Sequence, residues 1–279
     1  MNLTLNSKVA LITGGSRGIG AAAVRAFADA GAKVVFNYHS SKAQAEDLAR
    51  ECGAENCRAV QGDLSTTEAA RKLVSSAVSA FGRLDILVAN HGIWPPEDAP
   101  IDRMSDEQWH RTIAVNLDSV FSLVKHSVAQ MKKQAAASAK SSAGTKPGAS
   151  SESASGASSG AAGHLVLISS TSGQRGEAFH CDYAATKGAL ISMVKGLSTE
   201  LARDRIYINA VAPGWVDTDM SAPALNDPPT RDKIFRGIPL GRVGTPQEIA
   251  GPILFLCTPY AGFITGEIFN VNGGAVLVG

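Results

Sequence analysis

The chain has 279 residues, of which 44% are hydrophobic and 18% are charged, so it is long enough to bury a core as one α/β domain. Its formal net charge of +1 gives no reason to expect nucleic acid or an anionic membrane as a partner. No run of about 20 apolar residues and no signal peptide is visible, and the cysteines form no Cys-x-x-Cys pair, so we expect a cytoplasmic protein. The histidines lack metal-ligand spacing, so we expect no metal centre.

Predicted strands and helices alternate along most of the chain. Short apolar runs predict strands near 8–13, 33–38, 57–62, 84–90, 164–169, 206–212 and 267–271. The segments between them predict helices near 18–30, 41–52, 66–81, 105–133, 182–203 and 246–257. This alternation predicts a doubly wound parallel sheet of about seven strands with helices on both faces. Ligands of such sheets bind beyond the carboxyl ends of the strands.

A glycine-rich turn follows the first predicted strand. The apolar run Val9–Ile12 ends at the pattern Gly14-x-x-x-Gly18-x-Gly20, and a helix-forming run then extends to a capping glycine at Gly31. A strand, a glycine turn and a helix N-terminus together direct backbone N–H groups and the helix dipole at an anion. The turn therefore predicts a phosphate site.

The stretch 134–163 interrupts the alternation. Twenty-four of its thirty residues are Ala, Ser or Gly, and none is a large apolar residue. Such a segment cannot bury enough surface to offset the entropy of ordering it. We expect a flexible, low-complexity surface insertion between a crossover helix and the fifth strand, and the alternative is a spacer or an arm that docks a partner.

The segment from Ser170 to Lys187 carries the clearest chemistry. Tyr183 and Lys187 are four residues apart, which stacks the phenol and the ammonium on one helix face. A cation beside a tyrosine lowers the phenol pKa from its usual value of about 10 toward the working range. With the Ser170 hydroxyl at the same reacting oxygen, this set predicts proton transfer at an alcohol or ketone. Taken alone, Tyr-x-x-x-Lys more often means a half-buried tyrosine beside a solvated lysine.

The glycine turn and the distant tyrosine are part of a longer series of landmarks. In chain order these are Thr13–Gly20, Asp63-Leu64, Asn90-His91-Gly92, Asn116, Ser170, Tyr183, Lys187, Pro213-Gly214 and Thr218. The series resembles the short-chain dehydrogenase/reductase family over nearly the whole chain apart from the insertion. The resemblance implies one Rossmann-type dinucleotide-binding and catalytic domain over 1–279. The phrases at 36–38, 209–214, 264–267 and 271–274 look like the 3-oxoacyl-[acyl-carrier-protein] reductase branch of that family.

The resemblance implies a role for each of four catalytic residues. Tyr183 would give a proton to a carbonyl oxygen, and Ser170 would hydrogen-bond that oxygen. Lys187 would lower the Tyr183 pKa and hold the nicotinamide ribose. Asn116 would seat a water that links the lysine to solvent, although a single Asn in a helix more commonly has no such role.

The resemblance also implies a set of residues that contact the cofactor. These are Gly14, Ser16, Arg17, Gly18, Ile19, Gly20, Tyr38, His39, Ser40, Asp63, Leu64, Asn90, Gly92, Tyr183, Lys187, Pro213, Gly214, Val216 and Thr218. The glycine turn would hold the pyrophosphate, Asp63 and the Leu64 backbone would contact the adenine, and the segment from Pro213 to Thr218 would frame the nicotinamide.

The end of the second strand indicates which dinucleotide is used. An acidic residue there binds the ribose 2′-hydroxyl of NAD and repels the 2′-phosphate of NADP, and this chain has none. Arg17 in the glycine turn offers a guanidinium to a phosphate, and His39 and Ser40 offer further donors. We therefore expect NADP(H), although Arg17 alone could be a solvated loop cation.

The substrate is less well defined. By position, residues 215–236 are the family's substrate lid, and the branch implies a 3-oxoacyl thioester carried by acyl-carrier protein, an acidic partner. Lys132 and Lys133 would meet that partner, but the insertion separates them from the fifth strand, and Asp204 stands at a second position where a basic residue is expected. The alternatives are a sugar, polyol, steroid or cyclic ketone as substrate, or a non-catalytic nucleotide-sensing protein. The resemblance and the uncharged, apolar C-terminal segment also predict a homotetramer.

Overall fold

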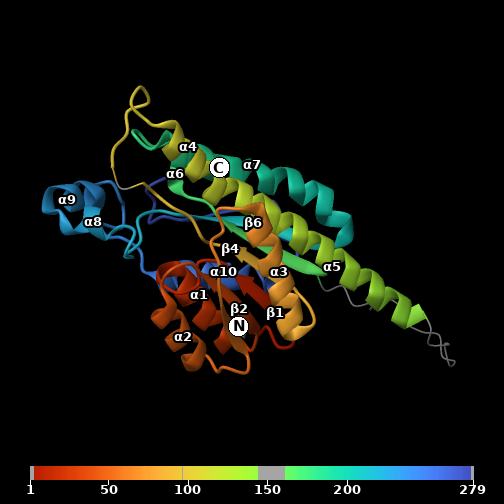
Figure 1. Ribbon diagram of the computed structural model, residues 1–279. Coiled ribbons are helices and arrows are strands. Elements are labelled where there is room, and N and C mark those ends of the chain that lie inside the picture. Colours follow the sequence, from red (N-terminus) through yellow and green to blue (C-terminus); the bar gives the residue numbers. More distant parts are fainter. Residues whose placement is uncertain (1–2, 96, 144–160, 278–279) are drawn as a thin grey trace.

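The computed structural model describes residues 3–95, 97–143 and 161–277, and its centre is a seven-stranded parallel sheet between two layers of helices (Figure 1). The strands are β1 (Val9–Ile12), β2 (Lys33–Tyr38), β3 (Cys57–Gln61), β4 (Ile86–Ala89), β5 (Gly163–Ile168), β6 (Ile206–Pro213) and β7 (Ile268–Val271). Their order across the sheet is β3-β2-β1-β4-β5-β6-β7. The predicted doubly wound fold is confirmed, and the chain changes direction across the sheet between β1 and β4, where such sheets bind their ligands.

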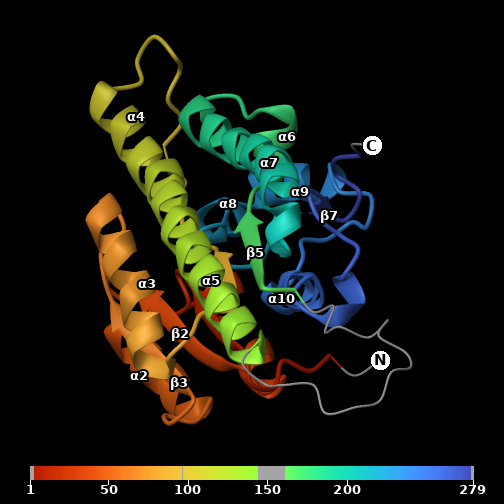
Figure 2. The same ribbon diagram turned by 90° about the vertical axis from the view of Figure 1, so that its right-hand side faces the viewer.

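Each face of the sheet carries its own hydrophobic layer. Helices α1 (Gly18–Asp29), α2 (Lys42–Glu51) and α10 (Pro246–Phe255) cover one face, and α3 (Thr67–Phe81), α5 (Ser119–Ala143) and α7 (Cys181–Leu201) cover the other. Figure 2 shows α5 running between α3 and α7. In β4, Ile86 and Val88 pack into the first layer and Leu87 packs into the second. Since both faces are covered, the central strands are continuous apolar runs rather than alternating ones.

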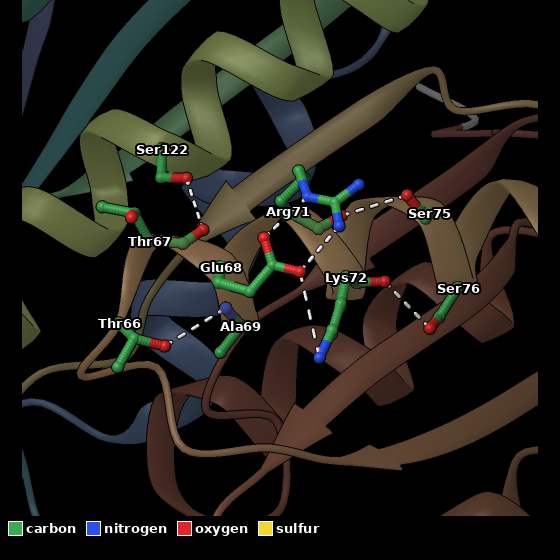
Figure 3. A network of polar contacts seen from close by, with 9 residues as sticks. All are labelled: Thr66, Thr67, Glu68, Ala69, Arg71, Lys72, Ser75, Ser76 and Ser122. Atoms are coloured by element: carbon green, nitrogen blue, oxygen red, sulfur yellow. Dashed lines mark hydrogen bonds and ion pairs between the residues drawn. The ribbon is translucent and has the colours of Figure 1, made fainter.

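Side-chain contacts fix the start of α3 beside α5 (Figure 3). The Thr66 hydroxyl caps α3 by accepting from the Ala69 N–H at 3.2 Å, and Glu68 in the first turn forms a two-pronged ion pair with Arg71. The Ser122 hydroxyl of α5 donates to a backbone carbonyl of the first turn of α3 at 2.8 Å. These contacts hold the long helix that follows the candidate catalytic residue Asn116.

The helix predicted near 105–133 has three parts and is longer than expected. It consists of α4 (Asp106–Ile113), a π-helical turn (Ala114–Asp118) and α5, which continues to Ala143. The first ten residues of the predicted insertion therefore extend α5, because alanine-rich sequence favours helix and because Gln134 anchors the helix. Its amide accepts from the Leu84 N–H at 2.8 Å and donates to the Leu84 carbonyl at 2.9 Å. Residues 144–160 of the predicted insertion lie outside the described residues.

The predicted lid region contains two short helices that the sequence analysis did not anticipate. Helix α8 (Ala222–Asn226) and helix α9 (Pro228–Arg236) both have proline in the first turn, and the Asp227 carboxylate caps α9 by accepting from the Thr230 N–H. Both helices lie at one side of the molecule in Figure 1. A further short helix, α6 (Thr171–Arg175), leads from β5 toward α7. Within the described ranges, every helix is too short or too polar to span a bilayer.

Candidate active site

A cavity of about 740 Å³ lies over the carboxyl ends of the strands. Its walls come from the segments that follow all of the strands except β7. All predicted cofactor residues line it, as do Ser170, Tyr183 and Lys187. The fold therefore brings together residues that are up to about 200 positions apart in the chain.

The glycine turn has the backbone that its sequence predicts. Gly14 and Gly18 have φ angles of +62° and +53°, a region that strains residues with a Cβ. A Cβ on Gly20 would collide with the Gly14 carbonyl oxygen, so these glycines allow α1 to start close to β1. The Asn90 amide braces the turn by donating to the carbonyls of Thr13 and Gly14 at 3.0 and 3.2 Å. No acidic residue stands in the first turn of α1, which leaves its N-terminus suited to a pyrophosphate.

The ends of β2 and β3 form the other end of the cavity. No carboxylate occurs in β2, and His39 follows it with its Nε2 3.9 Å from an Asp63 oxygen. The backbone N–H of Ser65 donates to Asp63 and lowers the pKa of that carboxyl. The end of β2 itself therefore has no carboxylate, and the nearest one, Asp63, follows β3 and lies beside His39. Arg17, His39 and Ser40 line this end of the cavity and could donate hydrogen bonds to a ribose or a phosphate.

The glycine turn also touches the segment that follows β6. The Arg17 guanidinium lies 3.3 Å from an Asp219 carboxylate oxygen, and both side chains are exposed. A Cβ on Gly18 would lie 3.2 Å from the Thr218 methyl group. Arg17 is therefore a partly neutralised cation at the cavity rim, and since exposed ion pairs are weak, it is available to a phosphate.

Ser170, Tyr183 and Lys187 meet on the cavity wall beyond β5. Ser170 is the second residue after β5 and caps α6, where its hydroxyl accepts from the Ser172 N–H at 3.1 Å. Tyr183 and Lys187 lie in the first two turns of α7, with the lysine Nζ 5.6 Å from the centre of the tyrosine ring. The Lys187 ammonium is almost fully buried and donates to the Ile168 carbonyl at 2.8 Å. The predicted proton-transfer set is thus adjacent in space.

The protonation of this set differs from the expectation drawn from the sequence. Burial raises the pKa of Tyr183 to about 12, and the hydrogen bond with Ser170 only partly opposes it. The pKa of Tyr183 is thus raised in this structure rather than lowered as expected, because the cost of burying a phenolate exceeds the effect of the Ser170 hydrogen bond. Burial also lowers the pKa of Lys187 to about 8. At neutral pH, Tyr183 is therefore a protonated phenol beside an ammonium.

Asn116 lies behind this set rather than on the cavity wall. It occupies the π-helical turn, a distortion often found at functional sites, and its side chain is fully buried. Its amide accepts from the Ile93 N–H at 2.8 Å and donates to the Ile93 carbonyl at 2.9 Å. Asn116 thus fixes the loop after β4, in which the backbone at Gly92 passes close to both Asn116 and Lys187.

His91 joins three elements of the site, a role that its sequence context did not indicate. Its Nδ1 lies 2.7 Å from the Thr13 hydroxyl and its Nε2 lies 2.6 Å from the Ser119 hydroxyl. Ser119 donates its own proton to the Val115 carbonyl, so it accepts from His91, which assigns the proton to Nε2. Desolvation and then the charge of Lys187 lower the His91 pKa to about 4. The imidazole is therefore a neutral link between β1, the loop after β4 and the start of α5.

The sequence analysis expected a lid over 215–236, which includes Trp215, but it did not single out Trp94 or Glu177. Trp94 and Trp215 line the cavity from the loops after β4 and β6, with ring centres 6.3 Å apart in an edge-on arrangement. Glu177 lines it from the loop after α6 and accepts from the Ser172 hydroxyl at 2.6 Å. The available signal was position, because Trp94 and Trp215 lie in loops that follow central strands and Glu177 lies in the loop between Ser170 and Tyr183.

Two family models match the chain. One described as short chain dehydrogenase matches residues 8–162, and one described as enoyl-(acyl carrier protein) reductase matches residues 153–276. The chain is 35% identical to the 3-oxoacyl-[acyl-carrier-protein] reductase FabG of Chlamydia muridarum, over 98% of this chain and 99% of that protein. It is 36% identical to the 3-oxoacyl-[acyl-carrier-protein] reductase of a Synechocystis strain, over 98% of each chain.

Solved structures match over the same extent. A short-chain dehydrogenase/reductase from Brucella melitensis, described as a glucose/ribitol dehydrogenase, superposes with a TM-score of 0.84 at 32% identity and full coverage of both chains. A short-chain dehydrogenase/reductase variant from Serratia marcescens superposes with a TM-score of 0.81 at 32% identity, over 97% of this chain and 98% of that one.

Proposed function

The chain belongs to the short-chain dehydrogenase family and is an oxidoreductase, and we propose that it is an NADPH-dependent reductase of carbonyl compounds whose substrate is a 3-oxoacyl thioester. The main support for this reaction is that Ser170, Tyr183 and Lys187 line the same cavity as the glycine turn. The thioester rests on the relatives, which are named 3-oxoacyl-[acyl-carrier-protein] reductases.

The protonation state of Tyr183 is the one that a reduction needs. With its pKa raised to about 12, Tyr183 holds a proton at neutral pH that it can donate to a carbonyl oxygen. NADPH, when bound, supplies the hydride that goes to the carbonyl carbon. Ser170 would donate a hydrogen bond to the same oxygen as negative charge develops on it.

Lys187 and Asn116 would assist the proton transfer from Tyr183 without donating the proton themselves. The Lys187 ammonium lies near the ring that becomes a phenolate, and it would stabilise that charge and bind the hydroxyls of the nicotinamide ribose. Asn116 holds the loop backbone beside Lys187 and would seat the water through which Tyr183 recovers its proton. The proton consumed at the oxygen is thereby replaced from solvent.

NADPH is favoured over NADH by charge. The strand end that would face the adenosine ribose lacks a carboxylate, and Arg17, His39 and Ser40 line the cavity there. A 2′-phosphate would find these donors and no carboxylate in β2, while Asp63 and Asp219 lie beside His39 and Arg17.

Acyl-carrier protein and a second copy of the chain are the partners we propose. The relatives' names support acyl-carrier protein as a partner. One of the basic residues expected to bind it is already paired, because the Lys132 ammonium lies 2.6 Å from an Asp204 carboxylate oxygen. Lys133 and Arg203 remain exposed nearby in sequence. A small hydroxylated or cyclic ketone is the second candidate substrate, favoured by this partly neutralised basic surface.

A steady-state screen tests the proposal. Acetoacetyl thioesters, small ketones and polyols are compared as substrates, each with NADPH and NADH. We expect the highest kcat/KM for a 3-oxoacyl thioester with NADPH. A higher value for a sugar, polyol or cyclic ketone would replace the substrate, and no turnover of any carbonyl or alcohol would overturn the reductase function.

A further inference from the structure

We infer that Glu177 and Ser172 form a substrate-binding subsite that accepts a hydrogen bond from an O–H or N–H group of the substrate. This inference rests on the proposed carbonyl reductase function. It adds that the preferred substrate is a neutral carbonyl compound bearing such a donor, and that Glu177 determines this preference.

The position of Glu177 provides the first argument. Its side chain lines the same cavity as Ser170 and Tyr183. Its charge is also close enough to add to the rise in the Tyr183 pKa. A carboxylate on this wall therefore lies in the cavity that a substrate enters to reach the tyrosine.

The hydrogen bonding of Glu177 provides the second argument. The buried Ser172 hydroxyl donates to Oε2 at 2.6 Å, which fixes the carboxylate and leaves lone pairs on Oε1. None of the ion pairs in the described part of the chain includes Glu177. The group is thus an oriented acceptor without a protein cation, and an ionised carboxylate cannot donate.

The loop around Glu177 is held in place, as a binding subsite requires. Gly176 ends α6 with a φ angle of +78° and donates to the Ser172 carbonyl at 2.9 Å. Phe179 adopts φ of +67°, which strains a bulky residue, and its carbonyl accepts from the Ala99 N–H at 3.1 Å. Because these contacts exist without substrate, little ordering entropy remains to be lost on binding.

The remaining walls of the subsite agree with a neutral substrate that has both polar and apolar parts. Trp94 and Trp215 present aromatic surface to the cavity. Within the loop that holds Glu177, Arg175 also lines the cavity, and it is exposed. Apolar atoms would pack on the indoles while a donor group reaches Glu177, and an anionic group would be repelled there.

Two kinds of compound carry this chemistry, and matched pairs distinguish them. The amide N–H of a pantetheine-like thioester is present in acetoacetyl-N-acetylcysteamine and absent from S-ethyl acetothioacetate. A hydroxyl beside the carbonyl is present in hydroxyacetone and absent from butanone. Values of kcat/KM with NADPH are measured for all four compounds.

We expect the wild-type protein to prefer the donor-bearing member of at least one pair by about tenfold or more, since a site built for a hydrogen bond rejects the analogue that lacks it. Glu177→Leu should reduce that preference to near unity, and Glu177→Gln, which keeps an acceptor oxygen, should keep part of it. Glu200→Leu, a charge removal at an exposed position of α7, should leave the ratio unchanged. NADPH binding and the melting temperature show that each variant is folded.

The outcomes separate the two proposals. If the wild type shows no preference in either pair, or if Glu177→Leu keeps the preference, the subsite is wrong while carbonyl reduction stands. If the thioester pair responds, the donor is the pantetheine amide, and if the ketone pair responds, it is a neighbouring hydroxyl. If none of the four compounds is reduced, the proposed function fails and the inference fails with it.

Discussion

The ammonium of Lys187 lies 5.6 Å from the centre of the Tyr183 ring and donates to the Ile168 carbonyl, while the phenol keeps its proton with a pKa of about 12. The one-turn spacing of the two residues thus places a cation beside the ring without ionising it in this structure. An acid that stays protonated until its substrate arrives is suited to donating a proton in a reduction.

Replacing Tyr183 with Phe should remove this acid. The variant keeps the ring and its packing, so we expect several orders of magnitude to be lost from kcat while NADPH binding is retained. Turnover is measured at saturating cofactor and substrate, and cofactor binding is measured by fluorescence. If more than about a tenth of wild-type turnover remains, Tyr183 is not the proton donor.

The Lys187 pKa of about 8 predicts a pH dependence of turnover. Below that value the group is an ammonium, and it loses its charge as pH rises through it, so kcat should fall above about pH 8 if the charge is needed. Lys187→Arg will be slower, but its guanidinium does not titrate in this range and its residual kcat should not fall. A wild-type profile that is level to about pH 9.5, or a parallel fall in the Arg variant, would contradict the role of the ammonium.

The sequence predicts the sheet better than it predicts the substrate end of the site. The buried run Val9–Ile12 and the glycines after it require a particular backbone, so both the first strand and the phosphate turn follow from residue types alone. The partnership of Glu177 with Ser172, and that of His91 with Ser119, depend on how loops and helices from different strands meet, which local spacing does not encode.

Helix boundaries show the same limit. Alanine-rich sequence after Lys133 has high helix propensity and also low complexity, so composition alone gives two opposite predictions. The contact of Gln134 with Leu84, fifty residues away in the chain, decides in favour of helix. The π-helical turn at Asn116 likewise follows from tertiary contacts.

Arg17 should determine the preference for NADPH. We expect Arg17→Ala to lower kcat/KM for NADPH by about tenfold or more, the size of a lost charge-assisted hydrogen bond, with a much smaller effect for NADH. Arg25→Ala is the matched control, because Arg25 lies on α1, the helix that Arg17 precedes, but pairs with Glu51. Equal losses with both cofactors, or a wild-type preference for NADH, would show that Arg17 does not read a 2′-phosphate.

Exposed apolar side chains support assembly into a homotetramer. Phe121 on α5 and Leu277 near the C-terminus are 52% and 87% exposed, an arrangement that favours burial between copies of the chain. We predict a tetramer with two-fold symmetry, for which light scattering at micromolar concentration should give the mass of four chains. Phe121→Glu should lower this mass by disrupting one interface. A monomeric mass for the wild type would refute the prediction.

Shortening the insertion should have little effect on the catalytic domain. Residues 136–140 of α5 are exposed, whereas Met131 is buried and Gln134 holds the Leu84 backbone, so the helix packs on the sheet layer through residues before Ala136. We expect replacement of Ala136–Ala161 by a short glycine-containing turn to leave folding, tetramer formation and turnover of a small ketone nearly unchanged. Changing the length of a flexible connection alters its closure cost by only about 0.6 kcal/mol per doubling.

Replacement of residues 144–160 alone is the matched control, since it keeps all of α5. Turnover of a carrier-protein-bound substrate should respond to the longer deletion more than turnover of the ketone does, because Lys132 and Lys133 would then lie closer in sequence to β5. If the shorter protein fails to fold or loses activity on the ketone, the segment is structural, and its interpretation as a passive insertion is wrong.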